Sequence, residues 1–185
     1  SLHLALAIAI EPEVQVVLVD GDTPKQSLTE GFGLTGHPGL LDAAADRTMA
    51  LSSCIYETST PGLMFMPAGG RRGDSPELLG SSRMQQLLSG IGSGSGPCVV
   101  IMDSPPLLLA NEARALASVA DHVLLVVRAG VTSVKQVDLA IESMSSARNI
   151  YTILNQSVSV SSAEYQYGQR YGYGTAAEDS ATRGG

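Results

Sequence analysis

Several protein classes are excluded by what this sequence lacks. Its two cysteines, Cys54 and Cys98, form no CxxC pair, so a structural disulfide is not expected and a reducing cytosol suits the chain. No signal peptide is visible, and the longest apolar stretch, residues 2–10, falls short of the ~20 residues of a membrane span. A basic excess is also missing. The formal net charge of −7 therefore argues against a nucleic-acid partner.

What is present fits one globular domain. The 185 residues are 44% hydrophobic and 16% charged, which is enough apolar material for a sizeable core. Aliphatic runs alternate with helical patterns. The expected strands cover residues 14–19, 63–67, 98–102, 122–127 and 150–154. The expected helices cover residues 2–9, 27–32, 40–45, 75–88, 111–119 and 132–147. This alternation predicts an α/β fold with a mainly parallel sheet and helices on both faces.

The first strong functional signal is Asp20-Gly21-Asp22, which follows the β-branched run of residues 14–19. Residues two apart in an extended segment face the same side, so both carboxylates can point at one ligand. Two carboxylates this close favour a shared cation or proton. The alternative is a solvated Asp-Gly turn, although the run lacks the alternation of a hairpin strand.

The second signal is Asp103, which follows the strand at 98–102 and precedes Ser104-Pro105-Pro106. An acidic residue at this point is typical of a Walker B aspartate that positions magnesium. The alternative is a strand-end aspartate that caps a helix. Active sites of parallel sheets lie at the carboxyl ends of the strands, so Asp20, Asp22, Asp103, Asn155 and the turn at 128–130 are expected to converge.

The phosphate-binding loop G-x-x-x-x-G-K-[ST] is not found in the sequence. The segment at residues 2–9 has the composition of the helix that follows such a loop, and the chain starts at Ser1 without a methionine. We therefore expect the loop and its preceding strand to lie upstream of Ser1, so that the chain as written should not hold ATP tightly.

The carboxyl-terminal stretch, residues 156–185, is rich in Ser, Gly, Ala and Tyr and has little apolar periodicity, which predicts a disordered tail. It carries four clustered tyrosines: Tyr165, Tyr167, Tyr171 and Tyr173. They could be a low-complexity tail without a role, or phosphate acceptors that reach a neighbour's active site. Phosphorylating all four would add roughly −6 to −8 charges, enough to loosen a subunit interface.

These segments, in this order, resemble the bacterial tyrosine kinases (BY-kinases) of capsule and exopolysaccharide export, and within them the autokinases of exosortase-linked loci. The resemblance covers essentially the whole chain. It rests on Leu2 to Ala9, on 17–22 as Walker A′, on 101–106 as Walker B, on the connecting segments 39–42, 67–69 and 75–81, on the strand ends 126–132 and 153–155, and on the tyrosine cluster. The family usually has Arg two residues after the second aspartate, where this chain has Pro24 followed by Lys25.

The resemblance implies a P-loop NTPase-like fold of the deviant Walker class, with ATP and Mg²⁺ as cofactors. It implies that Asp20 is the base for the tyrosine hydroxyl and that Asp22 and Asp103 position the magnesium. Arg128 and Asn155 are the expected nucleotide-binding residues. A tyrosine hydroxyl, with a pKa of about 10, gains from a carboxylate that accepts its proton.

The resemblance also predicts the organisation and partners of the protein. Residues 1–155 would form a kinase domain lacking its first strand and Walker A loop, and residues 156–185 a flexible tail. The expected partner is a membrane polysaccharide co-polymerase that activates the kinase and anchors it, so the protein would be cytoplasmic and peripheral at the inner membrane. Tail-to-site contacts would join copies into a homo-oligomer.

Two other functions share these motifs. A ParA/MinD-type ATPase would position cargo by switching between monomer and dimer, and would carry no phosphotyrosine. The acidic charge and the lack of a basic or amphipathic terminal helix count against it. The other alternative is a catalytically dead interaction module.

Overall fold

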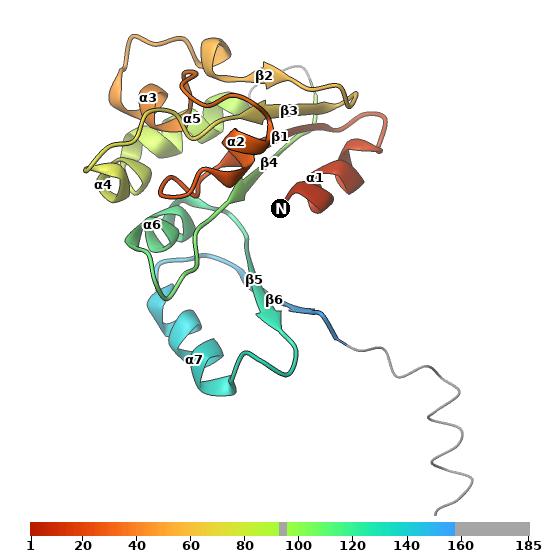
Figure 1. Ribbon diagram of the computed structural model, residues 1–185, viewed down its shortest axis with the longest axis vertical. Coiled ribbons are helices and arrows are strands. Elements are labelled where there is room, and N and C mark those ends of the chain that lie inside the picture. The colour runs from red at the N-terminus through yellow and green to blue at the C-terminus, as the bar shows by residue number, and fades with distance from the viewer. Residues whose placement is uncertain (93–95, 158–185) are drawn as a thin grey trace, which may run out of the picture.

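The protein is described here by a computed structural model that covers residues 1–92 and 96–157 (Figure 1). Its helices and strands alternate along the chain. The helices are α1 (Leu2–Ala9), α2 (Ser27–Gly31), α3 (Leu40–Ala45), η1 (Leu51–Cys54), α4 (Ser75–Leu79), α5 (Ser82–Ile91), α6 (Asn111–Val119) and α7 (Val134–Ser143). The strands are β1 (Gln15–Asp20), β2 (Tyr56–Glu57), β3 (Leu63–Met66), β4 (Cys98–Asp103), β5 (Val123–Arg128) and β6 (Ile150–Asn155).

The larger sheet has the strand order β2-β3-β1-β4. β1 lies in its interior and runs parallel to both neighbours, with Val16 opposite Leu63 on β3 and opposite Val99 on β4. Only the short strand β2 is antiparallel. An interior parallel strand with both faces covered reads as a continuous apolar run, which is why residues 16–19 show no polar alternation.

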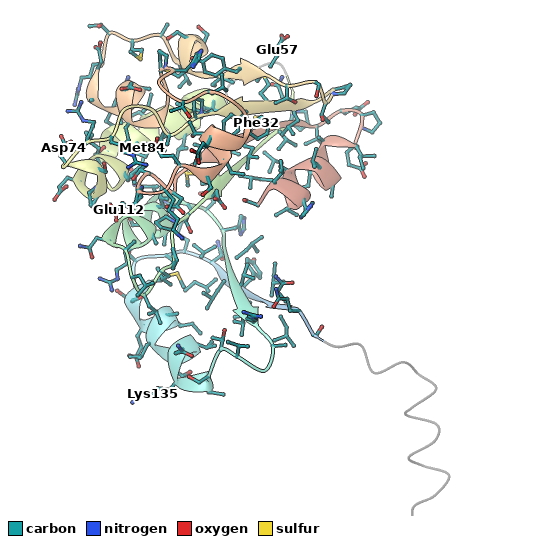
Figure 2. The ribbon with its side chains drawn as sticks, in the orientation of Figure 1. Phe32, Glu57, Asp74, Met84, Glu112 and Lys135 are labelled. Atoms are coloured by element: carbon teal, nitrogen blue, oxygen red, sulfur yellow. The ribbon has the colours of Figure 1, made fainter. Side chains whose placement is uncertain are left out.

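Helices cover both faces of this sheet. Val16 and Leu18 point to one face, where Ala5 of α1 and the half-buried Phe32 after α2 pack on them, and Phe32 stacks on Phe65 with ring centroids 4.1 Å apart (Figure 2). The other face is covered by α3, α4, α5 and α6. Its core residues include Val17, Val19, Leu41, Leu79, Met84 and Leu116. The predicted α/β class, with a mainly parallel sheet and helices on both faces, is confirmed.

The last two strands form a second sheet. β5 and β6 pair in parallel, from Val123 opposite Ile150 to Arg128 opposite Asn155. They lie with α7 at the end of the molecule away from β2 and β3 (Figure 1). Among residues 1–92 and 96–157, no strand joins this pair to β4. The expectation that all strands belong to one sheet is therefore corrected.

Two helices differ in their boundaries from the sequence prediction, and one strand is additional. The helix expected at 75–88 is two helices, because Gly80 and Ser81 interrupt it and the Ser81 hydroxyl caps α5 by accepting from Met84 N. The helix expected at 132–147 begins after Ser133, which forms a capping box with Gln136, and ends at Ser143. β2 was not predicted, since two residues are too few to show a periodicity.

Candidate active site at the carboxyl ends of β1 and β4

The two predicted Walker aspartates lie side by side. Asp20 ends β1 and is in register with Asp103, which ends β4. Gly21 N donates to the Asp103 carbonyl oxygen at 2.9 Å. A Cβ at position 21 would lie 2.5 Å from that oxygen and 2.7 Å from Leu116 Cδ1, so the approach of the loop requires glycine. The segment is a loop packed against β4 and not a solvated hairpin turn.

The Asp20 carboxylate is fully buried and has three donors. Its Oδ2 accepts from Thr29 N at 2.8 Å and from Thr29 Oγ1 at 2.7 Å, and its Oδ1 accepts from Asp22 N at 3.2 Å. Thr29 Oγ1 in turn accepts from Ala68 N at 3.0 Å. Burial raises the pKa of Asp20, while the Thr29 hydrogen bonds oppose that rise. Asp20 thus links the end of β1 to α2 and to the loop after β3.

Asp22 occupies the outer side of the same loop. Its Oδ1 accepts from Lys25 N at 3.3 Å, and its side chain is almost buried. Gln26 follows in a left-handed conformation, with φ at 59°, and its Nε2 donates to Gly69 O at 3.1 Å. That unusual backbone conformation is held by the contact with the loop after β3. The loop that carries Asp22 is therefore fixed by two hydrogen bonds, one from Lys25 N to Asp22 Oδ1 and one from Gln26 Nε2 to Gly69 O.

The amino end of α1 lies at Asp103. Ser1 Oγ donates to Asp103 Oδ1 at 2.6 Å. Next to Asp22, the hydroxyl of Thr23 is buried and has no hydrogen-bond partner within residues 1–92 and 96–157. A water or a ligand oxygen would supply the missing partner. The sequence alone did not single out Ser1, Thr23 or Thr29, because an isolated hydroxyl residue carries no motif.

The carboxylates of Asp22 and Asp103 fit a magnesium ion that takes most of its ligands from a bound nucleotide and from water. Asp22 and Asp103 are carboxylates on adjoining segments, and Mg²⁺ is commonly bound by one or two carboxylates together with substrate phosphates and waters. Within the described part of the chain, no group of three or more His, Cys, Asp or Glu side chains could hold a metal ion by itself. The protein would thus supply two ligands and the nucleotide the others.

A cavity of about 430 Å³ lies beside Asp22. Its walls are Pro24, Pro76, Pro105, Pro106 and Leu109, together with the start of α6. It lies between the loop after β1, the loop after β4 and α4. Figure 2 labels Glu112, one of its lining residues, on α6.

Arg128 and Asn155 are paired with each other and not with the aspartates. They are opposite each other at the carboxyl ends of β5 and β6, and Ala129 N donates to Asn155 O at 2.9 Å. Among the described residues, no hydrogen bond or ion pair joins either one to Asp20, Asp22 or Asp103. Their nucleotide-binding role stays a prediction. The four tyrosines, at 165, 167, 171 and 173, lie outside the described residues.

Comparisons of sequence and of structure both match this chain to kinases. Tyrosine-protein kinase CpsD of Streptococcus agalactiae serotype Ia is 30% identical over 167 residues, which are 89% of this chain and 70% of CpsD. The VpsO kinase domain superimposes with a TM-score of 0.72 at 30% identity, covering 85% of this chain and 77% of that one. This chain belongs to the bacterial tyrosine kinase family.

Other matches set the limits of that assignment. EpsB of Ralstonia solanacearum is 30% identical over 173 residues, which are 93% of this chain but only 22% of EpsB. The chain thus spans about a fifth of the length of that relative. No family model matches the chain.

More distant structures share the P-loop fold alone. Cobyrinic acid a,c-diamide synthase from Mycobacterium smegmatis, in a structure with a bound ATP analogue and magnesium, has a TM-score of 0.66 at 16% identity.

No helix within residues 1–92 and 96–157 is both long and apolar enough to cross a membrane.

Proposed function

We propose that this chain is the catalytic part of a protein-tyrosine autokinase that transfers the γ-phosphate of ATP to Tyr165, Tyr167, Tyr171 and Tyr173. The observation that carries the proposal is the pairing of Asp20 with Asp103 at the carboxyl ends of two parallel strands, with Asp22 on the adjoining loop. CpsD and other relatives named as tyrosine-protein kinases support the reaction class.

Each carboxylate has a separate task in this proposal. Asp22 and Asp103 hold the magnesium that, with ATP, supplies the charge neutralisation of phosphoryl transfer. Ser1 Oγ orients the Asp103 carboxylate through its hydrogen bond. Asp20 holds the loop in place through Thr29.

Asp20 can act as the proton acceptor only if the segments that cover it move. A general base must come within about 2.6–3.2 Å of the hydroxyl it deprotonates. Asp20 has no exposed surface and its oxygens are occupied by Thr29 and Asp22, so its predicted role as the base requires α2 to shift. The raised pKa of the Asp20 carboxyl suits a proton acceptor once a phenol can reach it.

We further propose that tail phosphorylation regulates the chain length and export of an exopolysaccharide, with a membrane polysaccharide co-polymerase as activator. Phosphate on several tyrosines adds like charges to one segment, and these charges weaken contacts between neighbouring copies. Attachment to the inner membrane would come from that partner.

The test is phosphotyrosine mapping of the full-length protein by mass spectrometry after incubation with Mg²⁺ and ATP. Phosphate is expected on Tyr165 to Tyr173 and is expected to be absent from Asp103→Ala. ATP turnover without any phosphotyrosine would contradict the kinase proposal and favour the positioning ATPase. Phosphate that persists in Asp103→Ala would contradict the metal assignment.

A further inference from the structure

Helix α2 has a single buried side chain, that of Thr29. The backbone N–H and the hydroxyl of Thr29 both donate to Asp20 Oδ2, at 2.8 and 2.7 Å. The hydroxyl also accepts from Ala68 N at 3.0 Å, in the loop after β3. The polar contacts between α2 and the sheet are therefore centred on the Asp20 carboxylate.

These contacts prevent Asp20 from accepting a further proton donor. A carboxylate oxygen has two acceptor positions, and Thr29 occupies both of those on Oδ2. The other oxygen, Oδ1, accepts from Asp22 N, and no part of the Asp20 side chain is exposed. A tyrosine hydroxyl can reach this carboxylate only after α2 has moved away from it.

Space for that movement lies on the far side of α2. A cavity of about 310 Å³ separates α1 from α2, and both helices pack on the same face of the larger sheet (Figure 1). Its lining residues are Leu2, Ser27, Leu28, Gly31 and Phe32. Ser27 and Gly31 are two residues before and after Thr29, which at 3.6 residues per turn places them on the opposite side of the helix. A shift of α2 into the cavity would thus draw Thr29 away from Asp20.

The two ends of α2 suit a small displacement. At the carboxyl end, Phe32 stacks on Phe65 and can remain in place as a pivot. At the amino end, Gln26 has a φ of 59°, which is unfavourable for a residue with a side chain, and its Nε2 donates to Gly69 O. Loss of that hydrogen bond would allow the Gln26 backbone to relax, so the strain at Gln26 favours release of α2.

We propose that the contact of Thr29 with Asp20 is autoinhibitory. In the closed state, which this structure shows, Thr29 occupies the carboxylate. In the open state, α2 shifts into the cavity beside α1, and Asp20 is free to accept the proton of the acceptor tyrosine. The proposal deepens the autokinase function proposed above and rests on it. Because the closed state must open before each transfer, Thr29 is a positioning residue that limits the rate.

The first test removes the Thr29 hydroxyl in the full-length protein. With Mg²⁺ and ATP, Thr29→Val should raise the initial rate of autophosphorylation about tenfold, which corresponds to ~1.4 kcal/mol, because a methyl group replaces one donor to Asp20. Thr29→Ser keeps the hydroxyl and should retain the rate of the unsubstituted protein. Thr29→Val should also lower the urea midpoint, so that rate and stability change in opposite directions. A purely structural Thr29 would lower both, and a slower Thr29→Val protein would overturn the proposal.

The second test stabilises the closed state. Gly31→Leu places a side chain in the cavity, because a Cβ at position 31 has no other atom within 4 Å and leucine favours a helix. It should lower the rate about tenfold, again ~1.4 kcal/mol, and raise the urea midpoint. Glu30→Leu is the matched control, since it adds the same side chain to α2 at a residue that does not line the cavity. Equal rates in Gly31→Leu and Glu30→Leu would contradict a movement into the cavity.

Hydrogen exchange measures the opening of α2 without catalysis. In the full-length protein without ATP, the amides of residues 27–33 should exchange faster in Thr29→Val and slower in Gly31→Leu, with the β1 amides as the unchanged reference. These exchange differences without any phosphotyrosine would retain the autoinhibitory contact and remove the kinase function. Tail phosphorylation with equal rates and equal exchange in all variants would retain the kinase function and remove the autoinhibitory contact.

Discussion

β1 and β5 carry similar aliphatic residues but lie in different surroundings. The four residues Val16 to Val19 are at most 1% exposed, because helices cover both faces of the larger sheet. In β5, Leu124 is 44% exposed and Val126 is 58% exposed, and in β6 Leu154 is 62% exposed. Parallel strands are normally covered on both faces, and a two-stranded sheet gains little stability alone.

This difference affects the predicted nucleotide site, because its aspartates and its Arg128–Asn155 pair lie at the ends of strands that are buried to different extents. Asp20 ends β1, which is buried from residue 16 onward, and Asp103 ends β4, an edge strand that is half-buried and is paired with β1 along its whole length. Arg128 and Asn155 end strands in which every apolar side chain is half-buried or exposed and none is fully buried. An exposed aliphatic surface of this kind is typical of a region that packs on something else. Four predictions test this contrast.

The largest expected effect is on the free energy of unfolding. Leu18→Ala removes a side chain with no exposed surface and should cost about 2–5 kcal/mol. Leu124→Ala makes the same chemical change at a side chain that is 44% exposed, and should cost less than about 1 kcal/mol. Urea denaturation followed by circular dichroism measures both. Equal losses would show that β5 is as well packed as β1.

The next effect is on phosphoryl transfer. Asp103→Asn keeps the shape of the side chain and removes its charge, so autophosphorylation should fall about 10²–10³-fold, the range for losing one electrostatic contact to the transition state. Asn155→Ala, at the end of the less buried sheet, should lower autophosphorylation less than tenfold, which corresponds to less than ~1.4 kcal/mol. Incorporation of labelled phosphate into the full-length protein gives both ratios. A larger loss in Asn155→Ala would reverse the proposed ranking.

A smaller effect is expected at the hydrogen bonds that hold the two regions. Thr29→Val removes one of the three donors to the buried Asp20 carboxylate and leaves Ala68 N without an acceptor, and should cost about 1–3 kcal/mol. Thr132→Val removes the acceptor of Arg128 N in an exposed turn, and should cost about 0.5–1.5 kcal/mol or less. Unfolding midpoints of the two variants are compared with Thr29→Ser, which retains the hydroxyl and should recover most of the loss.

The smallest effect concerns pH. Burial raises the pKa of Asp20 above its ordinary value of 3.8. The folded state therefore holds its proton to higher pH than the unfolded state does. Stability contributed by the protonated carboxyl is present below pH 3.8 and is lost as pH rises through the folded pKa. Asp20→Asn should flatten that part of the stability curve. An unchanged curve in Asp20→Asn would assign the pH dependence to other groups.

Much of the fold could be predicted from the sequence because its signals are local. The aliphatic runs at β1, β4 and β5, the aspartates that follow two of them, and the Ser133 cap are each visible within a few residues. Gly80 shows the limit of local signals. A single glycine inside a helical pattern is tolerated, and the helix ends there because Ser81 caps a new one.

The candidate site was predictable in part. Asp20, Asp22 and Asp103 follow strands, and the order of strands in a parallel sheet places such residues at one edge. Thr29 and Ser1 could not be found in this way, because their partners are distant in sequence and depend on how α2 and α1 pack. The four prolines of the cavity are likewise scattered over three segments.

By itself, the sequence determined the alternation of strands and helices, the two strand-end aspartates and the acidic charge, because these follow from composition and short-range pattern. The tertiary structure alone decided that Asp20 is buried and held by Thr29, that Pro24, Pro76 and Pro106 line one cavity, and that β5 is only partly covered where β1 is fully covered. Burial and long-range contacts depend on which elements pack together, and similar aliphatic residues can therefore form a core in one strand and an open surface in another.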